Sequence, residues 1–396
     1  MNKSSFLQPF TAGLVAAFVG FASTFAVMLK GLGAVGATDA QAASGLMALS
    51  LGMGLAGLCL CLTTRMPVSA AWSTPGAALL ASTGATAGGF PDAVGAFLVV
   101  GVLITAAGLI KPFGRMVAAI PSALANAMLA GILFGLCLAP IKGLIEAPPQ
   151  TAAIILTWLV VSRWKRLYAT PAAAIVAGVM IAFTGHGAGV GGAGAGLMPQ
   201  WEWTTPTFSL HAIVSLALPL FIVTMASQNL PGLAVLSAYG YKPEPGPLIA
   251  TTGVFTLAAA PFGGIAVNLS AITAAMCASP EASPDPKKRW IAAATAGVAY
   301  VVFGFLTGGV THFVSGSPIL VEAVAGLALL AAFGGALHNA LANISEREAA
   351  LATFLVAASG VGFYGIGGAF WGLLAGGAVL ALTRAGATGE GERKAA

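Results

Sequence analysis

The chain has 396 residues, of which 17 are Lys or Arg and 12 are Asp or Glu, so the formal net charge is +5. Charged residues make up 7% of the sequence and hydrophobic residues 58%, whereas a soluble domain carries about 25% charged residues to cover its exterior. This composition excludes a soluble globular domain and favours an all-α polytopic membrane protein in a lipid bilayer. The basic residues lie between apolar runs, so the positive charge indicates membrane topology and no nucleic-acid partner.

Apolar runs follow one another along the whole chain. A transmembrane helix needs about 20 apolar residues, and dividing the chain at charged residues, Pro and Gly predicts fourteen spans. The first of them is too long for the apolar part of a signal peptide and is therefore predicted to be a membrane helix. The predicted spans are 9–29, 40–63, 66–84, 92–110, 116–139, 150–162, 169–184, 208–238, 246–261, 263–279, 289–309, 317–337, 347–361 and 366–383.

The distribution of Lys and Arg tests this count, because cytoplasmic loops are enriched in basic residues. With a cytoplasmic N-terminus and fourteen crossings, 15 basic residues fall on the inner side and only Lys30 and Lys142 on the outer side. One span fewer would invert every later loop. Both termini are therefore predicted to be cytoplasmic, and the Gly-rich segment 185–206 is predicted to be a flexible external loop.

The two halves of the chain show a weak internal repeat. A shift of about 195–200 residues aligns span 1 with span 8 and residues 66–69 with residues 262–265. Each half then holds seven spans, and an odd number inverts the second copy in the membrane, as in many secondary transporters. A chance match between helices rich in Ala and Gly is the alternative.

Span 3 is predicted to be part extended and part helical. Pro67 and Pro75 prevent one continuous helix, and Thr74 followed by Pro75 is typical of the first residues of a helix. Extended residues 67–72 and a helix over 74–84 together cross the bilayer, which puts the helix N-terminus near its middle. The alternative is that the prolines only kink a packed helix.

Span 10 is predicted to have the same form. Gly263 and Gly264 suit an extended piece, and Asn268 or Ser270 can cap a helix that ends near Ala278. The two half-helices would then face each other at the membrane midplane. Unpaired N–H groups and the positive end of the helix dipole bind an anion such as a carboxylate without a charged side chain.

Three segments resemble the benzoate:proton symporter family (BenE) of bacterial inner membranes. They are residues 66–76 (MPVSAAWSTPG), 226–236 (ASQNLPGLAVL) and 268–275 (NLSAITAA). The resemblance covers nearly the whole chain and implies proton-coupled uptake of benzoate or a related aromatic carboxylate by alternating access. It also implies a fold shared with nucleobase and sulfate permeases, which often dimerises. In that fold a core domain (1–115 and 207–309) moves against a gate domain (116–206 and 310–396).

The residues expected to bind substrate cluster around the two broken spans. Benzoate needs an apolar slot for its ring and a few donors for its carboxylate. Trp72 is expected either to contact the ring or to serve packing, and Gln228 and Asn229 either to bind substrate or to join two helices. The candidates are Trp72, Ser73, Thr74, Gln228, Asn229, Asn268, Leu269 and Ser270, with Ser23 and Thr24 of span 1 as possible additions.

Proton coupling has one ionisable candidate within an apolar span, Glu322. Its position about one turn from the outer end of span 12 equally fits a structural role. Nucleobase permeases of this fold usually carry an acid in span 8 or 10, where this chain has Gln228 and Asn268. An aromatic acid that brings its own proton is the alternative to a carboxylate relay.

Other functions are less well supported by the residues. The four cysteines lie in apolar segments, and the four histidines are scattered without a metal-ligand spacing or a neighbouring nucleophile, so neither an enzyme nor a cofactor is expected. A passive channel needs a continuous polar path, which the few intramembrane polar residues do not supply. A permease of the same fold for another small anion or a nucleobase remains the main alternative.

Overall fold

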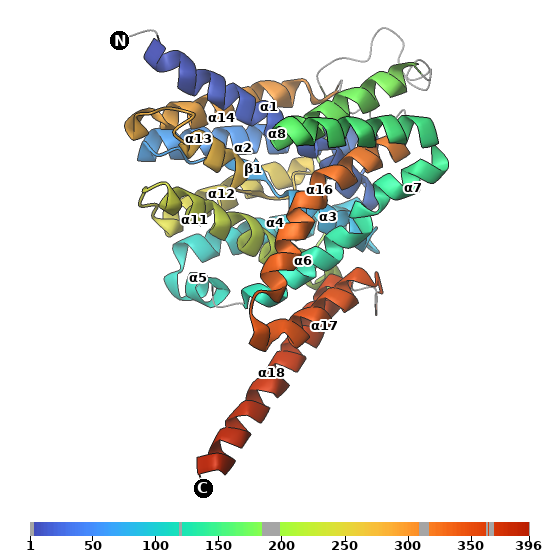
Figure 1. Ribbon diagram of the computed structural model, residues 1–396, viewed down its shortest axis with the longest axis vertical. Helices are drawn as coiled ribbons and strands as arrows, with labels where there is room; N and C mark the ends of the chain where they lie inside the picture. Colours follow the sequence, from blue (N-terminus) through green and yellow to red (C-terminus); the bar gives the residue numbers. More distant parts are fainter. Residues whose placement is uncertain are drawn as a thin grey trace.

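The computed structural model describes residues 4–118, 121–183, 199–308, 317–361, 363 and 368–395, and these are helical apart from two short paired strands and the connecting loops (Figure 1). Six segments are long and apolar enough to cross a bilayer: Leu7–Ala34, Asp39–Thr64, Phe90–Leu109, Ser122–Glu146, Leu210–Ala238 and Pro318–Leu341. The prediction of an all-helical polytopic membrane protein is confirmed. The predicted number of fourteen crossings is larger than these six segments and stays a prediction. Residues 184–198 of the predicted loop, with His186, lie outside the described residues, as does His312.

One group of elements, called here the strand-bearing bundle, contains both strands. Helices from the first and the middle part of the chain alternate in it, since α2 packs along α14 and α4 along α12 (Figure 1). Its elements are α1 (Ser4–Ala34), α2 (Asp39–Thr64), β1 (Ala70–Trp72), α3 (Thr74–Thr83), α4 (Phe90–Leu109), α9 (Leu210–Ala212), η1 (Ile213–Ala217), α10 (Leu218–Thr224), η2 (Met225–Asn229), α11 (Leu230–Ala238), α12 (Pro245–Ala259), η3 (Ala260–Phe262), β2 (Val267–Leu269), α13 (Ile272–Ala278), η4 (Pro286–Lys288) and α14 (Trp290–Phe305).

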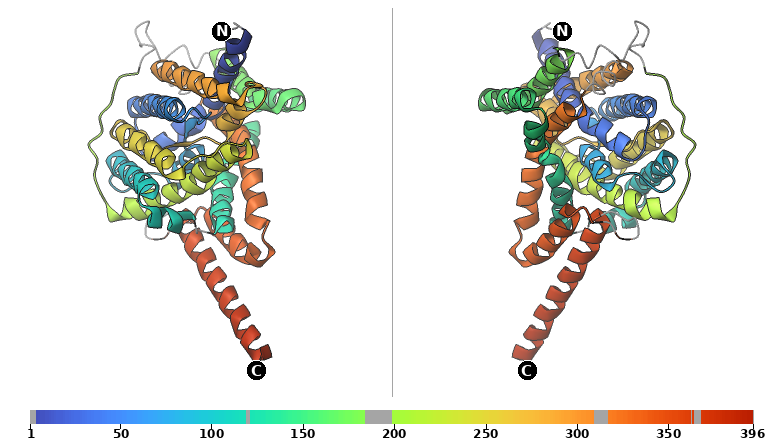
Figure 2. Two further views of the ribbon diagram at one scale, coloured as in Figure 1. Left: turned by 90° about the vertical axis from the view of Figure 1, so that its left-hand side faces the viewer. Right: turned by 90° about the vertical axis from the view of Figure 1, so that its right-hand side faces the viewer.

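The remaining helices, called here the second bundle, pack against one side of the first. α16 lies along α6, and α17 lies along both α6 and α18, which points away from the rest of the molecule (Figures 1 and 2). One continuous apolar core joins the two bundles. The second bundle consists of α6 (Ser122–Cys137), α7 (Ala139–Glu146), α8 (Pro148–Phe183), α16 (Pro318–Leu341), η5 (Ile344–Glu346), α17 (Arg347–Ala358) and α18 (Gly368–Ala395), and α5 (Lys111–Ala118) connects it to α4.

The two strands form an antiparallel pair in which Ala71 lies opposite Asn268. The pairing continues beyond both strands, because Ser73 N–H donates to Ala266 O at 3.0 Å and Ser270 N–H donates to Ser69 O at 2.9 Å. Each strand leads directly into a short helix, β1 into α3 and β2 into α13. The prediction that segments 66–84 and 263–279 are part extended and part helical is therefore confirmed.

The caps of the two short helices differ from the prediction in detail. Thr74 was expected to cap α3, but it is the first helical residue, and the hydroxyl of Ser73 accepts the N–H of Gly76 at 3.1 Å. The physical reason is that Ser73 still has a non-helical backbone, which lets its side chain reach back over the first turn. At α13 the hydroxyl of Ser270 accepts the N–H of Thr273 at 3.1 Å, whereas Asn268 lies within β2.

Three other predicted spans also differ in detail from the prediction. Spans 150–162 and 169–184 form the single element α8, but its backbone is non-helical at Lys165 (φ −144°, ψ 98°), so two helices meet at the predicted basic linker. Span 208–238 was expected to be a regular helix and instead contains the π-helical segments η1 and η2. Such segments shift the faces of a helix and occur often at functional sites.

Glycine allows the closest helix crossings in the strand-bearing bundle. A Cβ on Gly54 of α2 would lie 2.6 Å from the carbonyl oxygen of Gly297 on α14, and one on Gly297 would lie 2.9 Å from that of Gly54. Gly108 of α4 and Gly246 of α12 face each other in the same way, at 2.6 and 2.8 Å. Small residues at such crossings let membrane helices pack by close backbone contact, because no hydrophobic effect drives them together in lipid.

Replacing Gly54 with Ala is expected to lower the stability of the protein by about 1–3 kcal/mol, because the new Cβ meets a backbone carbonyl that cannot rotate away. Thermal unfolding of the purified protein in detergent would measure it. Gly33→Ala on α1 is the matched control, since a Cβ there meets no atom within 4 Å. Equal unfolding temperatures for the two variants would contradict the packing argument.

Candidate substrate-binding site

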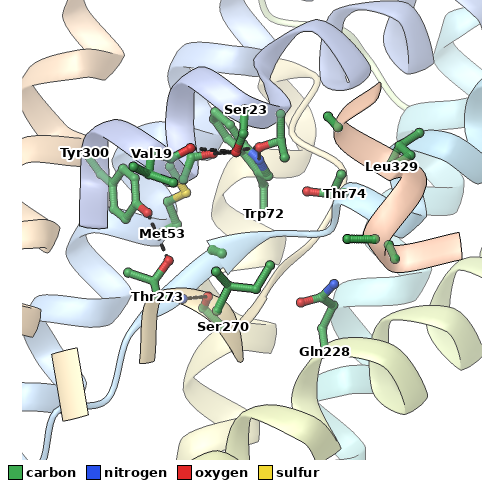
Figure 3. Close-up of a pocket in the computed structure, with 17 residues that line it drawn as sticks. Val19, Ser23, Met53, Trp72, Thr74, Gln228, Ser270, Thr273, Tyr300 and Leu329 are labelled. Carbon is green, nitrogen blue, oxygen red and sulfur yellow. Dashed lines mark hydrogen bonds between the residues drawn. The ribbon is translucent and has the colours of Figure 1, made fainter. Parts of the chain in front are cut away.

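A cavity of about 300 Å³ lies where the two bundles meet (Figure 3). Its volume is at the lower end of the range for small-molecule sites, which suits a ligand with a single ring. Its walls come from α1, α2, β1, α3, η2, α13 and α14 of the strand-bearing bundle and from α16 of the second bundle. The lining residues are Val19, Gly20, Ser23, Thr24, Met53, Ala71, Trp72, Thr74, Gln228, Ser270, Ile272, Thr273, Tyr300, Ala328, Leu329, Ala331 and Ala332.

The N-termini of α3 and α13 both contribute to this lining. In the first turn of α3, Pro75 has no N–H, and Ser73 accepts the N–H groups of both Gly76 and Ala77. This leaves the N–H of Thr74 without a partner among the described residues, and Thr74 lines the cavity. Ile272, the first residue of α13, also lines it. The cavity is therefore bordered by helix ends of the kind that bind anions.

Trp72 is held rigidly at one wall of the cavity. Its indole Nε1 donates to the hydroxyl of Thr24 at 2.8 Å, and its ring lies 5.2 Å from that of Phe21 on α1. The polar end of the indole is thus satisfied, and the ring offers an apolar surface that needs no rearrangement to contact a flat ligand. Trp72 therefore serves packing and lines the cavity at once.

Gln228 and Asn229 are adjacent in η2 but point to different places. Gln228 lines the cavity, and its amide has no hydrogen-bond partner among the described residues (Figure 3). Asn229 is fully buried, accepts the backbone N–H of Leu269 at 2.8 Å and donates to Met225 Sδ at 3.2 Å. Within the described residues, Gln228 thus lines the cavity with an unpaired amide, whereas Asn229 joins no second helix, as the alternative had expected, but supports β2.

Three other candidates lie behind the lining. Ser73 is fully buried and shares a hydrogen bond of 2.9 Å with Thr224 of α10, and the side chain of Leu269 belongs to the apolar core. Asn268 is also fully buried, and neither its Oδ1 nor its Nδ2 has a partner in the described part of the chain. A buried amide without partners is destabilising, so Asn268 is the candidate whose role is not explained by the fold.

The two candidates on α1, Ser23 and Thr24, line the cavity, but both hydroxyls donate to carbonyl groups of their own helix. Ser23 donates to Val19 O at 2.6 Å, and Thr24 donates to Gly20 O at 2.8 Å while accepting from Trp72. Sequence reasoning missed Thr273, Tyr300 and Met53 on one side of the cavity and Leu329 of α16 on the other (Figure 3), together with Ala328. Thr273 follows the predicted break in span 10 by a few residues, whereas the helices of Tyr300, Met53 and Leu329 carry no break or polar pair, so only the tertiary contacts reveal these three.

Charged side chains are absent from the lining among the described residues. Glu322 is not part of it and instead pairs with Lys30, with Oε2 and Nζ 2.9 Å apart and both side chains partly exposed. This ion pair joins α1 to α16 and so links the two bundles. Within the described residues there is also no group of three His, Cys, Asp or Glu side chains placed to hold a metal ion.

Comparison with known proteins decides the family. The sequence matches the model of the BenE family, "Benzoate membrane transport protein", over residues 5–382. The chain belongs to this family. It is a membrane transporter and not an enzyme, and the resemblance inferred from residues 66–76, 226–236 and 268–275 is confirmed.

Two curated relatives cover almost the whole of this BenE-family chain. It is 43% identical over 367 residues to the inner membrane protein YdcO of Escherichia coli (strain K12), which covers 92% of this chain and 93% of that protein. It is 31% identical over 376 residues to the benzoate membrane transport protein of Acinetobacter baylyi, which covers 92% of each.

Solved structures of anion transporters share the fold. The transmembrane domain of a cyanobacterium bicarbonate transporter, BicA, superposes with a TM-score of 0.60 at 15% identity and covers 95% of this chain and 98% of that one. SLC26A9 superposes with a TM-score of 0.59 at 14% identity and covers 97% of this chain and 66% of that one. At such low identity the likeness concerns the fold alone.

Replacing Asn229 with Ala is expected to lower stability by about 1–3 kcal/mol, because the buried N–H of Leu269 would lose its acceptor. Thermal unfolding in detergent would measure the effect. Asn126→Ala on α6 is the matched control, since the Asn126 amide only donates to Ser122 O of its own helix. Full stability of Asn229→Ala would contradict the supporting role assigned to this side chain.

Proposed function

We propose that this protein is a secondary active transporter that carries benzoate or a related aromatic carboxylate together with a proton. The observation that carries the proposal is the cavity itself: a small space bordered by the rigid face of Trp72, by two helix N-termini and by the free amide of Gln228. An aromatic ring fits the first feature and a carboxylate the other two. The family and the Acinetobacter relative support the same substrate.

The proposed orientation follows from the carboxylate's need for donors. It would lie near Thr74, whose backbone N–H and hydroxyl are both unpaired in the described residues, with the Gln228 amide beside it. Hydrogen bonds to a charged group contribute about 1.5–3 kcal/mol each, so two or three of them suffice for micromolar binding once ring burial is added. Asn268 would gain its missing partner from substrate, from water or in another state of the transport cycle.

We infer that transport occurs by alternating access between a core and a gate. The strand-bearing bundle corresponds to the proposed core of residues 1–115 and 207–309, and the second bundle to the proposed gate. The pairing of α2 with α14 and of α4 with α12 supports two inverted seven-span repeats, because an exchange of the halves converts one pair into the other. A cavity lined by both bundles changes its exposure when one moves against the other.

The proposed location is the bacterial inner membrane with both termini in the cytoplasm. The name of the Escherichia coli relative supports the membrane, and the distribution of 15 basic residues to 2 supports the orientation. A cytoplasmic N-terminus would put the Lys30–Glu322 pair toward the outer side, since Lys30 lies in the last turns of α1.

The first test is transport by the purified protein in liposomes. With an acidic exterior, labelled benzoate is expected to accumulate inside until a protonophore dissipates the gradient. Gln228→Ala is expected to weaken benzoate binding about tenfold, because a donor to the carboxylate is lost. Gln8→Ala is the matched control, since the Gln8 amide donates to Glu281 O outside the cavity. Accumulation of uracil or sulfate instead of benzoate would refute the proposal.

The second test concerns the proton. We propose that Glu322 takes part in coupling through its ion pair, because protonation would break the link between α1 and α16. Glu322→Gln is then expected to abolish accumulation driven by a pH gradient while benzoate exchange between the two sides continues. Lys142→Gln, which removes the other basic residue predicted on the outer side, is the control. If Glu322→Gln still accumulates benzoate, the proton travels with the substrate.

A further inference from the structure

The wall of the cavity formed by α13 and α14 carries two hydroxyl groups that no function above uses. The Tyr300 hydroxyl and the Thr273 hydroxyl are 3.3 Å apart, and the two residues are 2% and 3% exposed. An O–H···O hydrogen bond is usually about 2.7–2.8 Å long, so this contact is a weak one. Both residues line the cavity.

These two hydroxyls retain unused hydrogen-bonding capacity. Each hydroxyl can donate one hydrogen bond and accept others, yet in the described residues the pair makes only the single bond between its own two members. Apart from Ser270, whose hydroxyl accepts the backbone N–H of Thr273, the residues around them are mainly apolar, with Val19, Met53 and Ile272 among them. Phe and Val would pack equally well in a dry apolar wall, because replacing both partners of such a bond is nearly neutral.

The neighbouring helix α1 passes close to the pair at a glycine. Gly20 of α1 lines the cavity, and a Cβ on it would lie 2.4 Å from the Tyr300 hydroxyl and 3.5 Å from that of Thr273. Any larger residue would therefore cover the hydroxyls. Figure 3 shows the pair on the opposite side of Trp72 from Thr74 and Gln228, where the carboxylate is proposed to bind.

We infer that the Tyr300–Thr273 pair is a second polar subsite, which binds a hydroxyl group on the ring edge remote from the carboxylate. The substrate class is then hydroxylated benzoates, and the inference rests on the proposed function because it assumes that the carboxylate lies at Thr74. A ring hydroxyl that approaches both protein hydroxyls from the cavity donates to one and accepts from the other. An unsubstituted ring leaves the pair as it is.

The experiment compares ligands that differ only in hydrogen bonding. Binding of benzoate, 3- and 4-hydroxybenzoate, and 3- and 4-methylbenzoate to the purified full-length protein is measured by titration calorimetry. At least one hydroxyl isomer is expected to bind about fivefold more tightly than the methyl isomer of the same position, since one net hydrogen bond is gained. The inference is overturned if neither does.

Two variants test whether the pair causes that preference. Tyr300→Phe and Thr273→Val are each expected to remove the fivefold ratio. The double variant should have no larger effect than either single variant, because both changes remove contacts to the same ring hydroxyl. A purely structural role would change stability without changing the ratio. Tyr241→Phe is the matched control, since the Tyr241 hydroxyl donates to Pro286 O far from the cavity.

The failure of this inference can be told from failure of the proposed function. If benzoate binds and the ratio of hydroxyl to methyl isomer is one, or survives in Tyr300→Phe and Thr273→Val, the subsite is wrong and the proposed function stands. If none of the five acids binds to the unmodified protein, the proposed function itself is wrong and the subsite falls with it.

Discussion

The structure depends on satisfying the backbone of two chain segments that are extended in the interior of a membrane transporter. No water reaches such a depth to pair with free N–H and C=O groups, so each must find a partner in the protein. β1 and β2 pair with each other along one edge. On the other edge of β2, side-chain oxygens replace the backbone acceptors that a further strand would supply. Thr256 accepts the N–H of Val267 at 2.9 Å, and Asn229 accepts that of Leu269. The two half-helices begin where this pairing ends.

That arrangement explains why the site needs no charged residue. Ser73 and Ser270 cap their helices in part, and the N–H of Thr74, which has no partner among the described residues, belongs to a residue that lines the cavity. Backbone donors of this kind are fixed in place and stay neutral, so an empty cavity carries no buried charge that would have to be desolvated. Glu322 is not part of the lining and pairs with Lys30 between the bundles. The cavity lining and the ion pair thus use different residues of the same helix, α16.

Several of these features could be predicted from local residue patterns. Pro67 and Pro75 exclude a continuous helix, and the two strands and two short helices occur where those breaks predict them. The basic residues at 163–166 mark the kink in α8. What local patterns did not predict was the direction of individual side chains. Neighbouring Gln228 and Asn229 face a cavity and a strand, since successive residues of a helix point in different directions. Two polar residues in an apolar run do not indicate which of them has which neighbour.

The sequence by itself determined the kind of protein and the places where its helices break, because hydropathy, proline and charge act through the local chain and the lipid around it. The positions of the half-helices follow from local residues for the same reason, and the family follows from three short segments of characteristic sequence. The tertiary structure alone decided which polar groups remain free. Ser73 and Asn229 are hydrogen-bonded to the N–H groups of Gly76 and Leu269. Thr74 and Gln228 line the cavity without a partner among the described residues, and Thr273 and Tyr300 line it as a hydroxyl pair. Whether a donor is free depends on every neighbour it meets in space, and residues such as 229 and 269 meet only in the folded chain.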